Sequence, residues 1–394
     1  MRRVFLIVLD SVGVGGAPDA AAFGDAGANT LRAAFESGEL FVPNLEALGL
    51  GLVPGAEFLK APPSPLASYG VLTERSAGKD TTTGHWELAG LISREPMPTF
   101  PSGFPPALVE SLTRECGRRF LCNLPYSGTE VIRDFGEEHL VSGSPILYTS
   151  ADSVLQIAAH TDVIPLEELY RICRVARRLC VGEYAVGRII ARPFRGEPGN
   201  FVRTPDRRDF SLAPSGETML DRLSDEGLSV LSVGKISDIF AGRGITESYP
   251  EHGNADCIAR LLALARRDFR GLCFVNLVDF DTLYGHRNDA AGYARALSEF
   301  DRALSLLLPL LNREDALLIT ADHGCDPSDE STDHTRERVP LLVYGEALAP
   351  RSFGAQLGFA SVAQTVCELL GVSAPYPSPS VFDGGVEMKK EEMG

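Results

Sequence analysis

The stretch Val4-Phe5-Leu6-Ile7-Val8-Leu9-Asp10 near the N-terminus decides the fold. A short, wholly apolar run that stops at a carboxylate is typical of a buried parallel strand. Open parallel sheets bind their ligands beyond the carboxyl ends of the strands. We therefore expect Asp10 to lie at the ligand-binding edge of an α/β sheet.

Two other apolar runs stop in the same way, far along the chain. Residues 272–278 lead into Asp281, and residues 316–321 lead into Asp322. Because the carboxyl ends of parallel strands meet at one edge, we expect these acidic residues to converge with Asp10. Imidazole side chains follow both runs, so the candidate metal ligands are Asp10, Asp281, His286, Asp322, His323 and His334.

The chemistry of this set points to a metalloenzyme. Carboxylate and imidazole ligands suit Mn²⁺, Mg²⁺ or Zn²⁺, and the absence of thiolates argues against a structural zinc site. Two such ions can hold the attacking and departing oxygens of a phosphoryl transfer. Asp279 and Asp333 are neighbours that could replace members of the set, whereas we interpret Asp326 and Asp329 as solvated loop charges.

A candidate nucleophile lies in residues 78–87, Gly-Lys-Asp-Thr-Thr-Thr-Gly-His-Trp-Glu. A hydroxyl beside two divalent ions can lose its proton at neutral pH and attack phosphorus. If a helix begins here, its free N–H groups would also bind phosphate oxygens. The alternative is an ordinary helix cap followed by a polar first turn. Spacing alone does not choose among Thr81, Thr82 and Thr83.

Bulk composition limits the classes of protein. The 394 residues are too many for one compact core and predict two domains. A net charge of −16 disfavours nucleic acid and anionic membranes as partners. Eight cysteines without a C-x-x-C pair favour reduced thiols and a cytoplasmic protein. No apolar run approaches the length that a membrane span requires. We also expect the protein to be a monomer.

Strand and helix patterns alternate along the chain. We expect strands at 146–149, 186–191, 229–234 and 339–344, and helices at 165–179, 254–267, 290–311 and 362–370. The acidic strand ends lie at both extremes of the sequence, so one discontinuous core, residues 1–97 and 215–394, must be assembled from both. The middle, residues 98–214, reads as an inserted α/β domain, which could act as a lid over the strand-end site.

Several segments resemble one known family. They are F-L-I-V-L-D-S-V-G-V-G, G-K-D-T-T-T-G-H-W-E, S-A-D-S-V-L-Q-I-A-A-H, G-R-I-I-A-R-P-F, G-K-I-S-D-I-F, N-L-V-D-F-D-T-L-Y-G-H-R and T-A-D-H-G-C-D-P. In this order, from residue 4 to about 345, they resemble the prokaryotic phosphopentomutases of the alkaline phosphatase superfamily. The resemblance implies an α/β fold with an alkaline-phosphatase-like parallel-sheet core sandwiched by helices, and a smaller inserted cap.

The resemblance also implies a reaction. Family members interconvert ribose 1-phosphate, or 2-deoxyribose 1-phosphate, with the 5-phosphate through a phosphothreonine and a 1,5-bisphosphate intermediate. The matching threonine is Thr81. The family uses two Mn²⁺ ions, although other divalent ions are possible, and a sugar 1,6- or 1,5-bisphosphate activates it. One ion would be held by Asp281, His286 and His334, and the other by Asp10, Asp322 and His323.

Pentose phosphate contacts are implied mainly in the inserted domain. Ser150 and Asp152 would meet sugar hydroxyls, and Val154 and Ile190 would line the same pocket. Guanidinium groups pair with phosphate in a bidentate manner, which suits the distal phosphate. The residues assigned to that phosphate are Arg188, Arg203 and, from the core, Lys235. We interpret His160 as structural.

One residue departs from the family pattern: Cys325 stands where relatives carry a small polar residue. We expect this cysteine to pack as an uncharged side chain without disturbing the metal ligands. Rival hypotheses are another mutase or phosphodiesterase of the superfamily, which should lack the S-A-D-S-V-L-Q-I-A-A-H segment. A phosphatase with a site open to water and a silent metal-stabilised binding module are the remaining alternatives. The complete ligand set with an intact Thr81 segment argues against the binding module.

Overall fold

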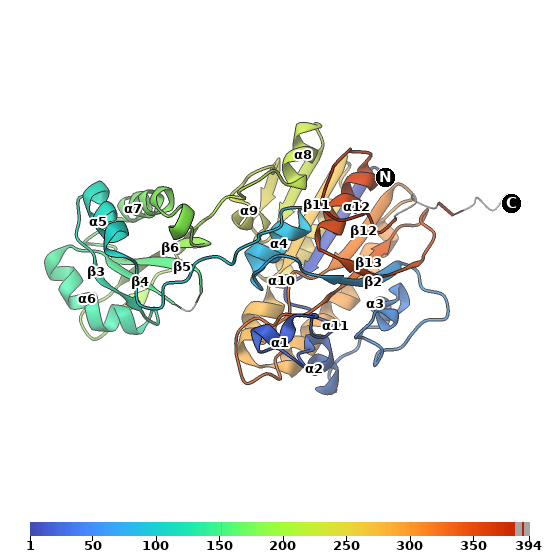
Figure 1. Cartoon of the computed structure of the whole chain (residues 1–394), viewed down its shortest axis with the longest axis horizontal. Coiled ribbons are helices and arrows are strands. Elements are labelled where there is room, and N and C mark those ends of the chain that lie inside the picture. The colour runs from blue at the N-terminus through green and yellow to red at the C-terminus, as the bar shows by residue number, and fades with distance from the viewer. Residues whose placement is uncertain (151, 383–387, 390–394) are drawn as a thin grey trace. The chain divides into compact units, whose positions relative to one another are not determined.

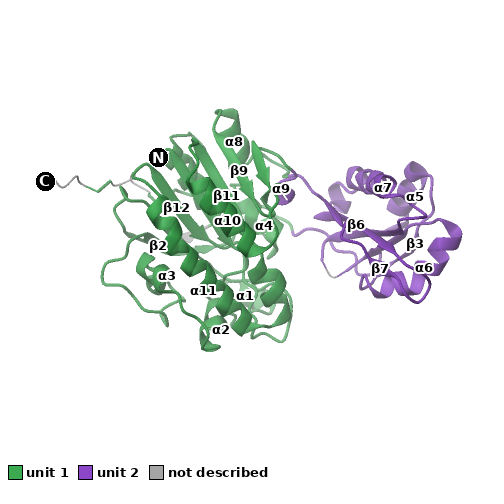
Figure 2. Ribbon diagram, turned by 180° about the vertical axis from the view of Figure 1, so that it is seen from behind, with its two compact units in different colours: residues 1–95, 214–237, 242–394 green, residues 96–213, 238–241 purple. Residues whose placement is uncertain are grey.

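The computed structural model describes residues 1–150, 152–382 and 388–389, and the chain forms two compact units (Figures 1 and 2). Unit 1 comprises residues 1–95, 214–237 and those from 242 onward. Unit 2 comprises residues 96–213 together with Asp238–Ala241. The boundaries that we expected after residues 97 and 214 lie within two residues of these divisions. Each unit has its own sheet.

An eight-stranded sheet forms the centre of unit 1, in the order β10-β9-β11-β1-β12-β13-β2-β14. Its strands are β1 (Arg3–Leu9), β2 (Ser68–Thr73), β9 (Ser229–Val233), β10 (Glu247–Tyr249), β11 (Gly271–Leu277), β12 (Asp315–Thr320), β13 (Val339–Tyr344) and β14 (Ser352–Leu357). β1 lies between β11 and β12 and is parallel to both. Within the described chain β13 is the one antiparallel strand of this sheet.

Helices pack on the sheet of unit 1 in two groups. One group contains α4 (Thr81–Leu88), α8 (Met219–Asp225) and α12 (Ala360–Leu370), with α12 against β1. The other contains α2 (Thr30–Glu36), α3 (Pro43–Leu48), α10 (Gly253–Ala265) and α11 (Ala290–Leu307), with α10 against β11. The short helix α1 (Ala20–Phe23) also belongs to unit 1, whereas α9 (Ile236–Ile239) spans the division between the two units. Covered in this way, β1, β11 and β12 are buried along their whole lengths, which explains their unbroken apolar runs.

Unit 2 is a smaller α/β layer with a six-stranded sheet. The strands are β3 (Leu121–Pro125), β4 (Ile146–Thr149), β5 (Val154–His160), β6 (Arg188–Arg195), β7 (Val202–Arg203) and β8 (Arg208–Ser211). β5 and β6 are parallel at its centre. The helices are α5 (Pro106–Cys116), α6 (Glu130–Ser142) and α7 (Leu166–Leu179). Two apolar clusters lie on the sheet, one beneath α5 and α7 and one beneath α6.

Most expected elements are present, with shifted ends. The strand expected at 186–191 is β6, which begins at Arg188 and continues to Arg195 because its pairing with β5 extends to Phe194. The helix expected at 290–311 ends at Leu307, where a 3₁₀ turn containing Pro309 follows. A proline cannot supply the N–H that the next helical turn would need. Among the described residues no helix is both long and apolar enough to cross a membrane.

Replacing Arg3 by methionine is expected to destabilise unit 1 by ~3–5 kcal/mol, because it leaves a buried carboxylate without its counter-charge. The Arg3 guanidinium donates to both carboxylate oxygens of Asp315, directly across the β1–β12 pair, and the two side chains are 7% and 0% exposed. Urea unfolding of wild type and variant would measure the loss.

The adjacent Arg2 offers a matched control. It pairs with Asp268 at 2.6 Å, but these side chains are 48% and 79% exposed. Arg2→Met should therefore cost less than ~1 kcal/mol, as expected for an exposed ion pair. Equal losses in the two variants would show that the Arg3 pair does not hold β1 to β12.

Candidate metal centre

The carboxyl ends of three neighbouring strands bring the predicted acidic residues together. Asp10 directly follows β1, Asp322 lies just beyond β12, and Asp281 lies in a single-turn π-helix, Phe280–Tyr284, that follows β11. All three side chains are buried, with residue exposures of 0%, 0% and 4% in that order. The convergence follows from the adjacency of β11, β1 and β12 in the sheet.

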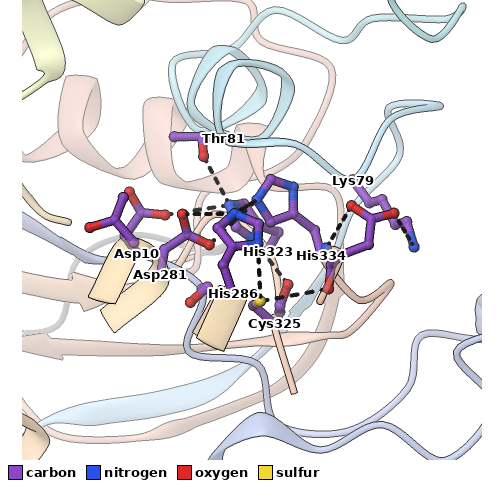
Figure 3. Close-up of polar contacts among 12 residues, drawn as sticks. Asp10, Lys79, Thr81, Asp281, His286, His323, Cys325 and His334 are labelled. Atoms are coloured by element: carbon purple, nitrogen blue, oxygen red, sulfur yellow. Dashed lines mark hydrogen bonds and ion pairs between the residues drawn. The ribbon is translucent and has the colours of Figure 1, made fainter. Parts of the chain in front are cut away.

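Two overlapping groups of ligating atoms result, each with its atoms within 4.8 Å of one another. The first contains Asp281, His286 and His334, and the second contains Asp10, Asp281 and His323. Figure 3 shows these side chains directed toward one another. They come from the segments that follow β1, β11 and β12. Asp281 therefore belongs to both groups, a sharing that the sequence did not predict.

Asp322 sits at the edge of the second group. Its Oδ2 lies 3.4 Å from Nε2 of His323, and its Oδ1 accepts a hydrogen bond from the Ser11 amide. The structure thus brings all six predicted ligands into one cluster, in which one oxygen of Asp322 is already engaged by a backbone amide.

The histidine rings turn Nε2 toward the cluster. Nδ1 of His286 lies 2.6 Å from the carbonyl oxygen of Thr332, and Nδ1 of His323 lies 3.0 Å from that of Gly324. A carbonyl oxygen can only accept, so Nδ1 carries a proton and Nε2 is the nitrogen available to a metal ion. Nε2 of His286 then faces Nε2 of His334 at 3.1 Å. A carbonyl oxygen that accepts from Nδ1 of a metal-ligating histidine holds the ring in the orientation that the metal requires.

The carboxylates are short of hydrogen-bond donors. Oδ1 of Asp10, Oδ1 of Asp281 and Oδ2 of Asp322 are buried and have no hydrogen-bond partner among the described residues. Burial and the charge of Asp322 raise the pKa of Asp10. Burial also acts to raise the pKa of Asp281, but the neighbouring imidazoles of His286 and His334 outweigh it and hold that pKa well below its usual range. Oxygen and imidazole donors converging with so much uncompensated negative charge fit divalent cations.

Thr81 faces the cluster, and its two neighbours do not share its position. Its Oγ1 lies 3.1 Å from Nε2 of His323, as Figure 3 shows. Thr83 is engaged elsewhere, because its Oγ1 donates to the carboxylate of Asp80, the N-cap of α4, at 2.6 Å. Thr82 is partly exposed and has no hydrogen bond from its side chain within the described chain. The geometry thus distinguishes three threonines that spacing could not.

Two buried residues that sequence reasoning missed support the cluster. His85 places Nδ1 2.9 Å from the carbonyl oxygen of Thr81 and 3.0 Å from Oδ2 of Asp322. Asn276 donates from Nδ2 to Oδ2 of Asp10 at 2.9 Å. The available signal for Asn276 was a lone amide inside an otherwise apolar strand. The signal available for His85 was its position one helical turn after Thr81.

The neighbouring acidic residues have other roles. Asp279 accepts a hydrogen bond from the amide of Asn254 in the first turn of α10, and the side chain of Asp333 is 60% exposed, 3.5 Å from Nζ of Lys79. The interpretation of Asp326 as a solvated loop charge was wrong. Asp326 is only 6% exposed, and its Oδ2 accepts a hydrogen bond from the amide of Asn29. It ties two loops together, which a sequence pattern cannot reveal.

Cys325 packs beneath the histidines as a neutral thiol. It is buried, and its Sγ lies 3.6 Å from the carbonyl oxygen of Asp333 and 4.0 Å from Nδ1 of His286. Burial raises the pKa of this thiol to about 11. A protonated thiol that donates to a carbonyl agrees with the neutral packing that we expected.

The predicted sugar and phosphate contacts of unit 2 mostly share one face of its sheet. Alternation along β5 and β6 puts Val154, Arg188 and Ile190 on the face that also carries Tyr148. Ser150 and Asp152 lie in the loop between β4 and β5, and Arg203 lies on β7 opposite Phe194, on the same face. Lys235 belongs to unit 1, between β9 and α9. These placements do not test the assigned roles.

His160, interpreted as structural, does belong to a hydrogen-bonded pair of histidines within unit 2. Its amide donates to Nε2 of His139 at 2.8 Å, and its own Nε2 lies 3.0 Å from the carbonyl oxygen of Gly196. An amide can only donate, so Nε2 of His139 must be unprotonated. Burial lowers the pKa of His139 below its ordinary value of 6.5.

Unit 2 is therefore expected to lose stability as the pH falls below 6.5. His139 then binds a proton in the unfolded chain but not in the folded unit. The free energy of unfolding therefore decreases by about 1.4 kcal/mol for each unit by which the folded pKa lies below the unfolded pKa. The loss of stability grows until the pH reaches the folded pKa of His139. Above pH 6.5 this histidine causes no loss of stability. Hydrogen exchange of the His160 amide against pH would measure it. His139→Gln should flatten the slope, and an unchanged slope would contradict this assignment.

Comparison with known proteins agrees with a metal centre. The family model described as the Metalloenzyme superfamily matches residues 2–374. In solved structures, PH0037 protein from Pyrococcus horikoshii shares the fold, with a TM-score of 0.52 and 14% identity over 95% of this chain and 99% of that one. Leishmania mexicana phosphoglycerate mutase does so with a TM-score of 0.50 and 12% identity over 98% of each chain.

The curated relatives identify a narrower family than the superfamily model does. The phosphopentomutase of Acetivibrio thermocellus is 56% identical over 95% of this chain and 97% of its own length. Those of Lachnoclostridium phytofermentans and Anaeromyxobacter sp. (strain K) are 53% and 54% identical over 97% and 94% of this chain, and 99% and 96% of their own. The chain therefore belongs to the phosphopentomutase family of the metalloenzyme superfamily. The family resemblance and the α/β fold class predicted from sequence are both confirmed.

Proposed function

We propose that this chain interconverts ribose or 2-deoxyribose 1-phosphate with the corresponding 5-phosphate, through phospho-Thr81 and a 1,5-bisphosphate intermediate. Its relatives and its family identify the chain as an isomerase of the phosphopentomutase type that uses divalent metal. One observation carries the finer proposal: the hydroxyl of Thr81 lies 3.1 Å from Nε2 of His323, inside a buried cluster of carboxylates and imidazoles.

The cluster fits a two-metal site. Asp281, His286 and His334 would hold one ion, and Asp10, Asp322 and His323 the other, with Asp281 near both. The orphaned oxygens of the three carboxylates support this assignment, and we propose Mn²⁺ as the native ion. When bound, the ions supply electrostatic stabilisation of the charge that develops during phosphoryl transfer.

The chain's own residues account for the rest of the chemistry. Thr81 is the first residue of α4, so the N–H groups of that turn that Asp80 does not cap would stabilise a phosphate on its hydroxyl. Phospho-Thr81 gives its phosphoryl group to the free hydroxyl of the pentose monophosphate: the P–O bond to threonine breaks and a P–O bond to the sugar forms. The resulting bisphosphate then returns its other phosphoryl group to Thr81. Net isomerisation results, and the enzyme is phosphorylated again.

The remaining parts of the proposal rest on family membership. Ser150, Asp152, Val154, Ile190, Arg188, Arg203 and Lys235 would contact the pentose and its distal phosphate. A sugar 1,6- or 1,5-bisphosphate would restore phospho-Thr81 after an accidental hydrolysis. All eight cysteines are unpaired, which supports a reducing, cytoplasmic setting.

A ³¹P NMR time course tests the proposal. The enzyme is mixed with Mn²⁺, ribose 5-phosphate and a trace of glucose 1,6-bisphosphate. Growth of a ribose 1-phosphate signal to a fixed ratio, with little free phosphate, would support the mutase. Steady release of inorganic phosphate would refute it and indicate a phosphatase. No change at all would refute pentose phosphates as the substrate.

A further inference from the structure

Arg336 is a buried arginine that lies two residues beyond the candidate metal ligand His334, and its side chain is 4% exposed. Its Nε and Nη2 donate to the carboxylate of Asp19 at 3.0–3.2 Å. Nη1 donates to Oε2 of Glu74 and to the carbonyl oxygen of Gly78, both at 2.7 Å. Nη2 also donates to the carbonyl oxygen of Glu74 at 3.1 Å. Each of the five N–H groups of the guanidinium therefore has an acceptor.

These hydrogen bonds join two segments of unit 1 that carry different parts of the candidate metal centre. Glu74 directly follows β2, and Gly78 lies three residues before Thr81, where α4 begins. Arg336 belongs to the segment that supplies His334. The bond from Arg336 to Gly78 thus connects residues 258 positions apart in sequence. It links the segment of the proposed nucleophile to the segment of a metal ligand.

The position of Gly78 bears directly on the first turn of α4. Asp80 is the N-cap of this helix, and its carboxylate accepts hydrogen bonds from both the amide and the hydroxyl of Thr83. A methyl group at Gly78 would lie 2.8 Å from Oδ2 of Asp80 and 2.9 Å from Oγ1 of Thr83, so Gly78 packs closely against the cap. Because packed groups transmit displacements, movement of Gly78 would reach the cap and Thr81 beside it.

The segment of His334 is anchored without help from the guanidinium group. The amide of Arg336 donates to Oδ2 of Asp25 at 2.7 Å, and the carbonyl oxygen of Arg336 accepts from the amide of Ala17 at 3.0 Å. The carboxylate of the next residue, Glu337, accepts further hydrogen bonds from backbone amides and hydroxyl groups. Shortening the Arg336 side chain should therefore release the segment of Gly78 and leave that of His334 in place.

Lys79 provides a second link between the two segments, which is weaker. Its Nζ lies 3.2 Å from Oδ2 of Asp25 and 3.5 Å from Oδ2 of Asp333, whose side chain is 60% exposed. Ion pairs that are open to solvent contribute little to stability. The pair of Arg336 and Glu74 is shorter, and its side chains are only 4% and 2% exposed. The guanidinium group is therefore the main connection.

We propose that Arg336 is a positioning residue of the phosphoryl transfer: by holding Glu74 and Gly78, it fixes the hydroxyl of Thr81 relative to the metal ligands. It acts through Gly78 and the cap of α4, not by contact with the substrate. A misplacement of about 1 Å can slow a reaction ~100-fold, because the reacting atoms must be held in near-attack geometry. The inference rests on the proposed function, since it takes Thr81 as the residue that carries the phosphoryl group.

Steady-state kinetics of Arg336→Met test this inference. Conversion of ribose 5-phosphate into ribose 1-phosphate is measured with Mn²⁺ and glucose 1,6-bisphosphate. We expect kcat to fall ~30–100-fold, whereas KM and the amount of bound Mn²⁺ should stay within about 2-fold of the wild type. The reason is that no predicted substrate contact or metal ligand is among the hydrogen-bond partners of this guanidinium. A wild-type kcat, or a loss confined to KM, would overturn the inference.

Arg338→Met is the matched control. Arg338 lies two residues further along the same segment, carries the same charge and is partly buried. Its Nε, however, has no hydrogen-bond partner among the described residues. Its replacement should leave kcat within about 2-fold of the wild type. Equal losses of kcat in Arg336→Met and Arg338→Met would overturn the inference, because they would reflect only the loss of positive charge near the centre.

Misfolding is controlled by a second pair of proteins. Arg336→Met leaves Glu74 as a buried carboxylate without its cation, which can destabilise the fold strongly. The substitution is therefore also made together with Glu74→Gln, which removes that charge. Glu74→Gln alone keeps an oxygen that can accept from Arg336, so its kcat should stay within ~3-fold of the wild type. If the double variant folds and turns over as fast as Glu74→Gln alone, the inference is wrong.

Hydrogen exchange distinguishes failure of this inference from failure of the proposed function. The amides of residues 74–80 should exchange at least ~10-fold faster in the double variant than in Glu74→Gln alone, and those of β11 should not change. Unchanged exchange at residues 74–80 would refute the link even if the wild type is a mutase. An absence of ribose 1-phosphate from the wild type would refute the proposed function, and the link would then have no role in pentose phosphate transfer.

Discussion

Thr81→Ala is expected to abolish formation of ribose 1-phosphate from ribose 5-phosphate, with kcat reduced at least ~1,000-fold. The variant removes the hydroxyl that lies 3.1 Å from Nε2 of His323. Thr83 cannot replace it, because its hydroxyl is hydrogen-bonded to Asp80. Turnover measured by ³¹P NMR, and the mass of the intact chain after incubation with glucose 1,6-bisphosphate, would check the result. Only the wild type should gain a phosphoryl group.

Thr82→Ala is the matched control for this experiment. It removes an identical side chain one residue further along α4, where the side chain is partly exposed. Its activity should stay within a few-fold of the wild type. A phosphorylated Thr81→Ala protein, or comparable losses in the two variants, would refute Thr81 as the nucleophile.

Asp281→Asn is expected to reduce the bound divalent metal from two ions to one or none, and to lower activity at least ~100-fold. Its carboxylate is the one that both groups of ligating atoms share, so a single substitution weakens both positions. Changes to residues that merely orient ligands already cost 10–100-fold in metal affinity, and loss of a shared ligand should cost more. Elemental analysis after dialysis against Mn²⁺ gives the stoichiometry without relying on activity.

Asp279→Asn tests whether the effect is specific to Asp281. Asp279 is two residues away and carries the same charge, but it accepts a hydrogen bond from the amide of Asn254 at the start of α10. Its replacement should leave the metal content unchanged and cost ~1 kcal/mol of stability, as for other helix caps. Metal retained at full stoichiometry by Asp281→Asn would rule out the shared position.

Metal binding should also appear in thermal stability. A ligand that binds only the folded state raises the Tm according to its concentration and affinity. We therefore expect Mn²⁺ to raise the Tm of the wild type and of Asp279→Asn, and to raise that of Asp281→Asn much less. This readout separates a lost metal site from a merely inactive one.

Much of the centre was predictable because it depends on strand ends. The apolar runs that precede Asp10, Asp281 and Asp322 are buried on both faces, so their pattern survives in the sequence without any alternation. Parallel strands then have to meet at one edge, whichever residues connect them. Family membership followed from the motifs that accompany these ends, and the relatives confirm it.

Other features depend on contacts that no local pattern records. The family motif singles out Thr81, but only the tertiary structure gives a physical reason: Oγ1 of Thr83 donates to Asp80, whereas Oγ1 of Thr81 lies 3.1 Å from Nε2 of His323. It also makes Asp281 common to both groups of ligands.

The sequence by itself determined the fold class, the family and the six residues that gather at the strand ends. Two features were set by the tertiary structure: the antiparallel direction of β13 and the burial of Asp326. The physical reason is range. Hydrophobic periodicity depends on residues that are close in sequence. Each of these features depends instead on groups that meet only when distant segments of the chain fold together.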